Sequence, residues 1–269
     1  MRFKILGPME FLTDDGASFA VNASKTSQVL ALLLVRCPET VSVDTLISEL
    51  WGERPPRSAV TTLQTYIYHA RRMLSRELPG DQRGIVLTRS PGYGVQVAPD
   101  DIDVNLFEKA VRRGRDLLEK GDAEQGVSVL SEGLGLWRGP AFAGLVVGDV
   151  LGTHVAHLEE LRIQAVGLRI AAERSLGRHL ELVPELRALV KAHPLNELFH
   201  AHLIEVLYDS GRRAEALEAY QQLRQVLDRE LGVEPTREMQ RLQRAVLHGD
   251  DTRSHRFAAG VSGRAHAAA

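Results

Sequence analysis

Two different spacings of apolar residues divide the chain near residue 100. Before this point, short apolar runs of strand length alternate with turn signals, and two stretches with helical spacing lie among them. After residue 101, apolar residues recur at i, i+3 and i+4 almost to residue 247, and strand patterns are missing. The pattern predicts a mainly α chain, with a small α+β domain over residues 1–99 and an all-α domain over residues 100–249. Residues 250–269 show no periodicity and many small residues, so we expect a disordered tail.

The first domain combines sheets and helices in a characteristic order. Three short runs, 2–6, 9–12 and 19–21, predict a small antiparallel sheet, and the nearly all-apolar segment 29–35 predicts a buried helix capped by Ser24 or Thr26. A short amphipathic helix over 43–51, a long helix over 57–77 and a hairpin follow. The hairpin strands are expected at 85–88 and 93–97, around a basic tip at 89–92. This order predicts a winged helix-turn-helix of the OmpR type, whose second helix enters the DNA major groove.

The long helix has two chemically different faces. The apolar face predicted to pack on the core consists of Val60, Leu63, Ile67, Ala70 and Leu74. The opposite face offers hydroxyls, methyl groups, aromatics and a cation, from Ser58, Thr61, Thr62, Thr65, Tyr68, His69 and Arg72. No acidic residue occurs before Glu77. A face of donors and methyl groups without negative charge suits duplex DNA, although hydroxyl residues on any solvated helix face would look similar.

The distribution of charge supports a nucleic-acid partner, whereas the net charge alone does not. The whole chain carries a formal charge of −2, but residues 57–89 contain six arginines against Glu77 and Asp81. This basic footprint covers the predicted reading helix and wing. The footprint is modest, so we expect a dimer or another bound partner to strengthen binding at physiological salt.

Composition also indicates where in the cell the protein is expected and what its cysteine does. No apolar run has membrane-spanning length, and the N-terminus lacks the apolar core of a signal peptide. We therefore expect a cytoplasmic, nucleoid-associated protein with no membrane partner. The single cysteine, Cys37, is predicted to be a packed thiol.

The second domain is predicted to contain consecutive antiparallel helices that form a tetratricopeptide-like array. Helical spacing covers the ranges 104–120, 123–137, 150–176, 180–192, 195–210, 213–231 and 236–247. A weak internal repeat places a glycine at the start of a related segment three times, at Gly121, Gly177 and Gly211. The last two glycines are separated by the tetratricopeptide period of about 34 residues. A helical hairpin of any kind can end in glycine, which is the alternative explanation.

Signatures of an enzyme are missing from the sequence. The nucleophile elbow, the zinc-protease motif, the phosphate-binding loop and the dinucleotide fingerprint do not occur. His154 with His157, and His200 with His202, have no partner set that would complete a metal site. The spacing of Gly144, Gly148 and Gly152 favours close packing. We expect no catalytic residues, no metal and no cofactor.

Several longer motifs resemble one regulatory family. Residues 50–59 (LWGERPPRSA), 61–67 (TTLQTYI) and 90–93 (SPGY) resemble the DNA-binding domain of the Streptomyces antibiotic regulatory proteins. The motifs at 136–139 (LWRG), 158–162 (LEELR), 193–194 (HP) and 231–235 (LGVEP) resemble the bacterial transcriptional activator domain that follows it in that family. The resemblance covers nearly the whole chain.

The resemblance implies a pathway-specific activator of a secondary-metabolite (antibiotic) gene cluster. Such a protein is expected to bind double-stranded promoter DNA as direct repeats near the −35 region, as a homodimer, and to recruit RNA polymerase through its sigma factor. The implied base and phosphate contacts come from Ser58, Thr61, Thr62, Thr65 and Arg72. Trp51 and Arg57 are implied to contact phosphates, Arg89 and Tyr93 to serve the wing, and Lys25 to be a weaker phosphate contact. Tyr66 is assigned to packing.

One rival function remains open at this stage. The tetratricopeptide-like half could make the chain a protein-interaction or signalling adaptor, with a winged helix that does not bind DNA. That alternative predicts no sequence-specific DNA binding and no effect of substitutions at Thr61 or Arg72. The sequence also leaves open a small-molecule inducer in the groove of the helical domain.

Overall fold

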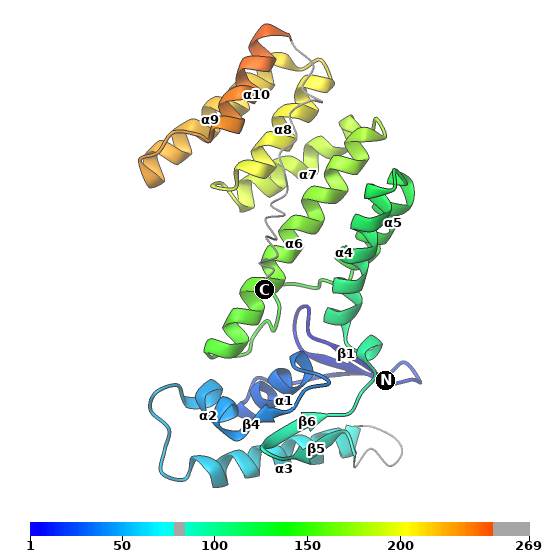
Figure 1. Ribbon diagram of the computed structural model, residues 1–269, viewed down its shortest axis with the longest axis vertical. Helices are drawn as coiled ribbons and strands as arrows, with labels where there is room; N and C mark the ends of the chain where they lie inside the picture. The colour runs from blue at the N-terminus through cyan, green and yellow to red at the C-terminus, as the bar shows by residue number, and fades with distance from the viewer. Residues whose placement is uncertain (78–83, 250–269) are drawn as a thin grey trace, which may run out of the picture. The chain divides into compact units, whose positions relative to one another are not determined.

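The computed structural model describes residues 1–77 and 84–249, and it confirms the mainly α fold class (Figure 1). The chain forms two compact units, which are described here one at a time. The first unit contains Met1–Arg113 and Val129–Ile163, and the second contains Gly114–Ser128 and the chain from Gln164 onward. Helical segments after residue 100 thus pack in the same unit as the predicted winged helix. The predicted tail at 250–269 lies outside the described residues.

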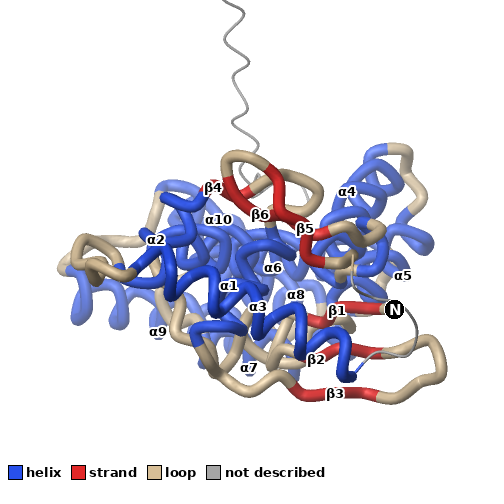
Figure 2. Tube along the Cα trace, turned by 90° about the horizontal axis from the view of Figure 1, so that it is seen from below, coloured by secondary structure: helices blue, strands red, loops and turns tan. Residues whose placement is uncertain are grey.

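The predicted N-terminal sheet is present as a three-stranded antiparallel meander (Figure 2). It consists of β1 (Arg2–Lys4), β2 (Glu10–Leu12) and β3 (Ser18–Ala20). In this register Phe3 lies opposite Phe11, and Phe11 lies opposite Phe19. The rings of Phe3 and Phe11 are buried and meet edge to face, with centroids 5.3 Å apart, so they anchor the sheet on the core.

Three helices follow, as the apolar spacing predicted. They are α1 (Lys25–Val35), α2 (Val43–Trp51) and α3 (Ala59–Glu77). The hydroxyls of Ser24 and Ser42 cap α1 and α2 by accepting hydrogen bonds from backbone N–H groups of the first turn. The connection between α2 and α3, residues 52–58, is longer than a tight turn and begins at Gly52 with φ = +60°.

The start of α3 corrects two details of the prediction. The helix begins at Ala59, so Arg57 and Ser58 lie in the preceding turn. Val60, predicted to be buried, is 51% exposed, and Ala59 occupies the core position instead. The other predicted core positions, Leu63, Ile67, Ala70 and Leu74, are buried.

The wing belongs to a second three-stranded sheet. Its strands are β4 (Val41–Ser42), β5 (Val86–Arg89) and β6 (Gly92–Val95), in the order β4-β6-β5. The hairpin of β5 and β6 was predicted, but its loop is only Ser90-Pro91 and β4 was missed. Gly92 is required here, because a Cβ at this position would lie 1.9 Å from the Val41 carbonyl oxygen.

The predicted helices of the second half are confirmed, with ends that differ from the prediction by at most three residues. They are α4 (Asp103–Glu119), α5 (Ala123–Leu134), α6 (Asp149–Ser175), α7 (His179–Ala192), α8 (Glu197–Asp209), α9 (Arg213–Leu231) and α10 (Arg237–His248). A short 3-10 turn, η1 (Pro99–Asp101), precedes them.

The three repeat glycines occupy equivalent turns. Gly121, Gly177 and Gly211 have φ values of +84°, +80° and +74°. In each turn the residue after the glycine donates its N–H to the carbonyl five positions earlier, as in Asp122 to Leu117 and Arg212 to Leu207. This is the bonding of a glycine-terminated helix end, repeated at the α4–α5, α6–α7 and α8–α9 junctions. The repeat in the sequence therefore has a common structural cause.

Within the first unit, the motif around Trp137 contacts the N-terminal sheet. The N–H of Arg138 donates to the Leu6 carbonyl at 2.8 Å, and its guanidinium lies 3.0 Å from a Glu10 carboxylate oxygen. The buried carboxylate of Asp103 accepts N–H groups from Ile5 and Leu6 at 2.9 to 3.1 Å. Burial raises the pKa of Asp103, although these hydrogen bonds favour its charged form. These bonds attach the start of the helical half to the N-terminal sheet.

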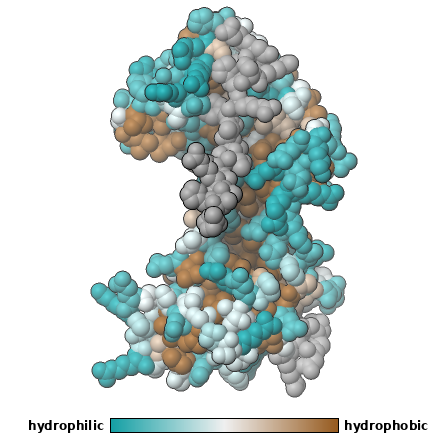
Figure 3. Space-filling view, viewed as in Figure 1, coloured by the Kyte–Doolittle hydropathy of each residue, from teal (hydrophilic) through white to brown (hydrophobic). Residues whose placement is uncertain are grey.

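The core of the second unit lies where α7, α8, α9 and α10 pack together. Its largest buried contributors include Leu186, Leu207, Leu223 and Leu242. Leu231 and Val233, at the C-terminal end of α9, are about half exposed, and Figure 3 shows an apolar area at this end of the helix. The surface over α9 and α10 in the same view is otherwise largely hydrophilic.

Candidate nucleic-acid interface

A stripe of exposed side chains runs along α3. Thr61, Thr65, Tyr68 and Arg72 are all exposed, and at about 100° per residue they fall within a sector of about 60°. Ser58 and His69 extend this face and are also exposed, whereas Thr62 is half-buried at its edge. The structure therefore brings the predicted reading residues together on one accessible helix surface.

The hydroxyls on this stripe are partly engaged within the helix. The Thr65 hydroxyl donates to the Thr61 carbonyl at 3.1 Å, and the Ser58 and Thr62 hydroxyls lie 3.4 Å apart. Since the Thr65 hydroxyl is turned toward its own backbone, its methyl group is the part left to contact an external surface. A thymine methyl in the major groove is an apolar partner of this kind.

The inner face of α3 and an aromatic stack fix the position of this stripe. Leu63 and Ile67 are buried, and α3 packs against α1. Trp51, at the end of α2, stacks on Tyr66 with ring centroids 6.2 Å apart and an interplanar angle of 26°. The packing role predicted for Tyr66 is confirmed. The indole N–H of Trp51 makes no hydrogen bond within the described part of the chain, so it remains available as a donor.

Arg71, which the sequence analysis did not single out, ties the wing to α3. Its Nε donates to the Val86 carbonyl at 3.0 Å, and an Nη atom donates to the Thr88 hydroxyl at 2.8 Å. Both acceptors lie on β5. A basic residue among basic neighbours gives no sequence signal of this role, because its partners lie in a different element.

The predicted wing residues have different surroundings. Arg89 is exposed at the end of β5, and an Nη atom donates to the Pro38 carbonyl at 3.4 Å. Tyr93 is half-buried on β6, opposite Thr88 on β5 and Val41 on β4. Arg89 is therefore the more accessible of the two side chains.

Two further predicted phosphate contacts lie near the N-termini of helices. Arg57 is exposed in the turn that precedes α3. Lys25 starts α1, but its ammonium group donates to the Leu50 carbonyl at 2.6 Å and to Gln28 Oε1 at 3.1 Å. Lys25 therefore supports the end of α2, with at most one donor left for a phosphate.

Other candidate chemistry is limited. No three His, Cys, Asp or Glu side chains in residues 1–77 and 84–249 are placed to hold a metal ion. His200 and His202 are buried, and Cys37 is a half-buried thiol whose pKa burial raises. None of the helices in the described ranges has the length and apolarity needed to cross a bilayer.

The glycine series Gly144, Gly148 and Gly152 was only partly interpreted correctly. Gly148 does pack closely, because a Cβ there would lie 2.3 Å from the Glu49 carbonyl oxygen. A Cβ at Gly144 or Gly152 would meet open space, so close packing does not explain these two glycines.

Comparison with known proteins identifies both parts of the chain. A family model described as the bacterial transcriptional activator domain matches residues 102–247, and one described as "transcriptional regulatory protein, C terminal" matches residues 21–95. The chain is 39% identical to the regulatory protein DnrI of Streptomyces peucetius over 254 residues, with 93% of both proteins covered. It is 34% identical to the transcriptional regulator RedD of Streptomyces coelicolor, with 93% of this chain and 71% of RedD covered.

Longer relatives share the same two parts. The regulatory protein AfsR of Streptomyces griseus is 33% identical, and the chain spans 25% of its length. The structure of Mycobacterium tuberculosis EmbR in complex with a low affinity phosphopeptide matches with a TM-score of 0.85 and 30% identity. That match covers 93% of this chain and 65% of the EmbR chain.

These matches agree with the winged helix and the helical array seen in the structure. The matched proteins are transcriptional regulators and not enzymes. The chain therefore belongs to the family of Streptomyces antibiotic regulatory proteins, transcriptional activators with an OmpR-type winged helix and a bacterial transcriptional activator domain.

Proposed function

We propose that this protein is a sequence-specific DNA-binding activator of a secondary-metabolite (antibiotic) biosynthesis gene cluster. The observation that carries the proposal is the exposed stripe of Thr61, Thr65, Tyr68 and Arg72 on α3. No acidic residue occurs in this helix before its last position, Glu77. A stripe of this kind offers methyl groups, hydroxyls and a cation to the floor and walls of the major groove. The functional division is proposed to lie near residue 100, with residues 1–99 binding DNA and residues 100–249 activating transcription.

The roles of individual residues follow from their accessibility. Thr61, Thr62 and Thr65 contact bases, with the Thr65 methyl directed at a thymine methyl. Ser58, Arg57 and Arg72 contact the adjoining phosphates, and the Trp51 indole N–H donates to a phosphate beside the end of α2. Arg89, with Tyr93, contacts the backbone or minor groove through the wing, and Lys25 makes the weakest phosphate contact.

The arrangement on DNA follows from the modest charge of one copy. We propose that two copies bind head to tail on one face of the duplex, as a homodimer on direct repeats near the −35 region. Repeats about one helical turn apart, about 10–11 bp, place both copies on the same face. In this position the protein recruits RNA polymerase through its sigma factor, in the nucleoid of the cytoplasm.

Protection mapping on promoters of secondary-metabolite biosynthetic genes tests this function. The full chain is expected to protect two segments of the same direction, about one turn apart and next to the −35 element. Leu231→Ser, a change of an exposed residue far along the sequence from α3, is expected to leave the protection pattern intact. Protection of no promoter, or of inverted segments, would contradict the proposal.

The adaptor function remains the second candidate, because the helical unit carries a groove of its own. Substitutions at Thr61 and Arg72 distinguish the two candidate functions. Substitutions there abolish promoter activation if the protein acts on DNA, and they have no effect if the winged helix is inert.

A further inference from the structure

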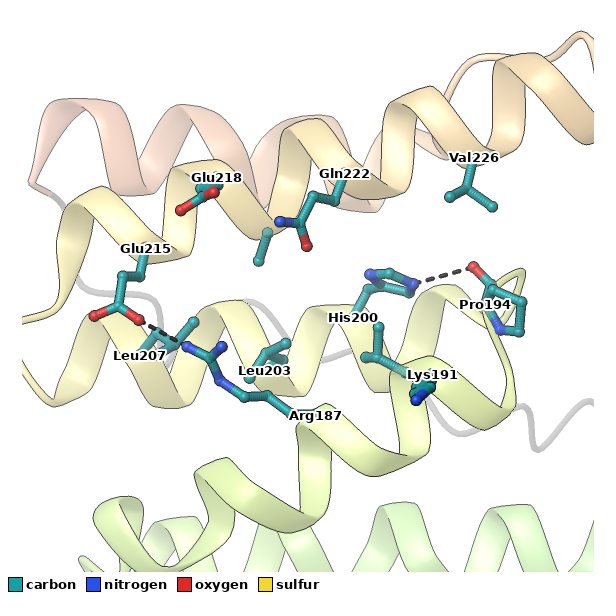
Figure 4. Close-up of a pocket in the computed structure, with 12 residues that line it drawn as sticks. Arg187, Lys191, Pro194, His200, Leu203, Leu207, Glu215, Glu218, Gln222 and Val226 are labelled. Carbon is teal, nitrogen blue, oxygen red and sulfur yellow. Dashed lines mark hydrogen bonds and ion pairs between the residues drawn. The ribbon is translucent and has the colours of Figure 1, made fainter.

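The second unit contains a groove that the proposed DNA function does not use. It lies on one side of α8, between α7 and α9, and encloses 510 Å³ (Figure 4). This volume lies within the range of about 300–1,000 Å³ that is typical of ligand sites. The groove lies entirely in the second unit, and α3 contributes nothing to it.

The groove has an apolar floor and two walls of opposite charge. Leu203 and Leu207 of α8 and Ala219 of α9 are buried and form the floor. The α7 wall is basic, with Arg187 and Lys191. The α9 wall carries Glu215, Glu218 and Gln222, which Figure 4 shows directed toward the groove.

One end of the groove is closed by an ion pair, while the polar groups farther along it are free to accept a ligand. An Arg187 Nη atom lies 2.7 Å from a Glu215 carboxylate oxygen, and Glu215 is also bonded by Arg212. Lys191, Glu218 and Gln222 make no side-chain hydrogen bond or ion pair with any described residue. All three are exposed, so the groove presents a cation, an anion and an amide that a ligand can engage.

His200 adds a buried polar atom without a partner. The residue is only 3% exposed, and its Nε2 lies 3.1 Å from the Pro194 carbonyl oxygen. A carbonyl only accepts hydrogen bonds, so Nε2 carries the proton and Nδ1 is left as an acceptor. Nδ1 has no hydrogen-bond partner in the described structure. An N–H or O–H donor of a bound ligand would satisfy this buried acceptor.

The length of the groove matches a short extended peptide. From Glu215 to Val226, α9 advances by about 16 Å, at about 1.5 Å per residue. About five residues of an extended peptide cover this distance, at about 3.3 Å each.

We propose that this groove binds a short extended peptide segment of a partner protein. An apolar side chain of the peptide lies over Leu203 and Ala219, an acidic side chain pairs with Lys191, and a basic side chain pairs with Glu218. Backbone groups of the peptide form hydrogen bonds with the Gln222 amide, and a backbone N–H of the peptide donates to His200 Nδ1. The proposal is independent of the DNA function, because it uses only residues of α7, α8 and α9.

A peptide array with charge-reversed variants tests this proposal. The full chain is titrated with labelled pentapeptides that contain a central leucine flanked by every combination of Asp, Lys and Ser. The wild type is expected to prefer peptides with one acidic and one basic residue. Lys191→Glu replaces the unpaired cation of the α7 wall with an anion and is expected to shift the preference to doubly basic peptides, by about fivefold in affinity. Glu218→Lys is expected to shift it to doubly acidic peptides.

Matched controls reverse exposed charges at the end of α4, away from the groove lining. Lys120→Glu and Glu119→Lys make the same changes in net charge and are expected to leave the peptide preference unchanged. Equal shifts in these controls would overturn the proposal, as would the failure of every pentapeptide to bind.

A chain ending at Gly249 tests whether the protein's own tail, residues 250–269, occupies the groove instead of a partner peptide. If removal of residues 250–269 raises peptide affinity tenfold or more, the groove is filled by the protein's own tail and the proposed partner is rejected.

Discussion

The carboxylate of Glu49 on α2 accepts a hydrogen bond from the backbone N–H of Leu151, in the first turn of α6, at 3.0 Å. The same carboxylate accepts the N–H groups of Gly148 and Val150 at 2.6 and 3.0 Å, and Gln28 Nε2 at 2.9 Å. Glu49 is 2% exposed. It therefore satisfies donors at the N-terminus of α6 that have no partner within the helix, and it fixes α2 to α6 inside the first unit.

Glu49→Gln is expected to destabilise the first unit by about 1.5–3 kcal/mol, because an amide nitrogen replaces one oxygen that accepts N–H groups and the negative charge is lost. Urea unfolding measures the change. Asp149→Asn makes the same chemical change at an exposed position of the same helix turn and is expected to cost about 0.5 kcal/mol or less. Equal losses in the two variants would show that burial of Glu49 is not important.

Thr65 is expected to recognise DNA through its methyl group, since its hydroxyl is bonded to the Thr61 carbonyl. Thr65→Val keeps a methyl group at this place and is expected to retain the base preference. Thr65→Ala is expected to cost about 1–3 kcal/mol at one operator position, with little change in non-specific binding. Binding to operators substituted at single positions gives the answer. A uniform loss on every sequence would reject base reading by Thr65.

Arg72→Ala is expected to weaken DNA binding and to reduce the slope of log K against log salt by about one unit, because one phosphate is no longer neutralised. The measurement is a salt titration of binding. Arg112→Ala, an exposed arginine on α4, is the control and is expected to leave the slope unchanged. An unchanged slope in Arg72→Ala would remove Arg72 from the interface.

The stability of the second unit is expected to fall below about pH 6.5 because of His200. Burial lowers the pKa of His200 below its ordinary value, while the Pro194 carbonyl and the Glu197 carboxylate act in the opposite direction. The unfolded chain therefore binds the proton more readily, so stability is present above the unfolded pKa and is lost as the pH falls. The loss reaches at most about 1.4 kcal/mol per pH unit.

Comparison of the wild type with His200→Asn isolates this effect. Burial also lowers the pKa of His154 in the first unit, with Arg36 and His157 adding to the shift. That contribution is common to both proteins and cancels in the difference. Unfolding free energies between about pH 5 and pH 7 should fall less steeply for His200→Asn. Parallel curves would show that His200 does not titrate differently in the folded state.

The sequence predicted those parts of the fold that depend on local periodicity. The helices of the second half were predicted because apolar residues recur every three or four positions, and the equivalent turns were predicted from Gly121, Gly177 and Gly211. The reading face of α3 followed from the same spacing. In the first turn of α3 the spacing of apolar residues gave the wrong residue. Ala59 and Val60 are both apolar, and the structure buries Ala59 and exposes Val60.

Long-range polar contacts could not be predicted. Glu49 looks like an ordinary polar residue of an amphipathic helix, and its partner Gly148 is 99 positions away. Arg71 was indistinguishable from the cations beside it, since only the folded hairpin shows that it bonds to β5. The family resemblance implied a phosphate contact for Lys25, whereas in the structure the Leu50 carbonyl already takes one of its donors.

Selection of bound DNA from a random pool at about 150 mM salt tests the central claim, sequence-specific DNA binding, most directly. The predicted result is enrichment of two half-sites in the same direction, about 10–11 bp apart, and loss of this enrichment with Thr65→Ala or Arg72→Ala. Recovery of unrelated sequences, with binding that disappears at this salt concentration, would contradict the claim and assign the function of the protein to its helical unit.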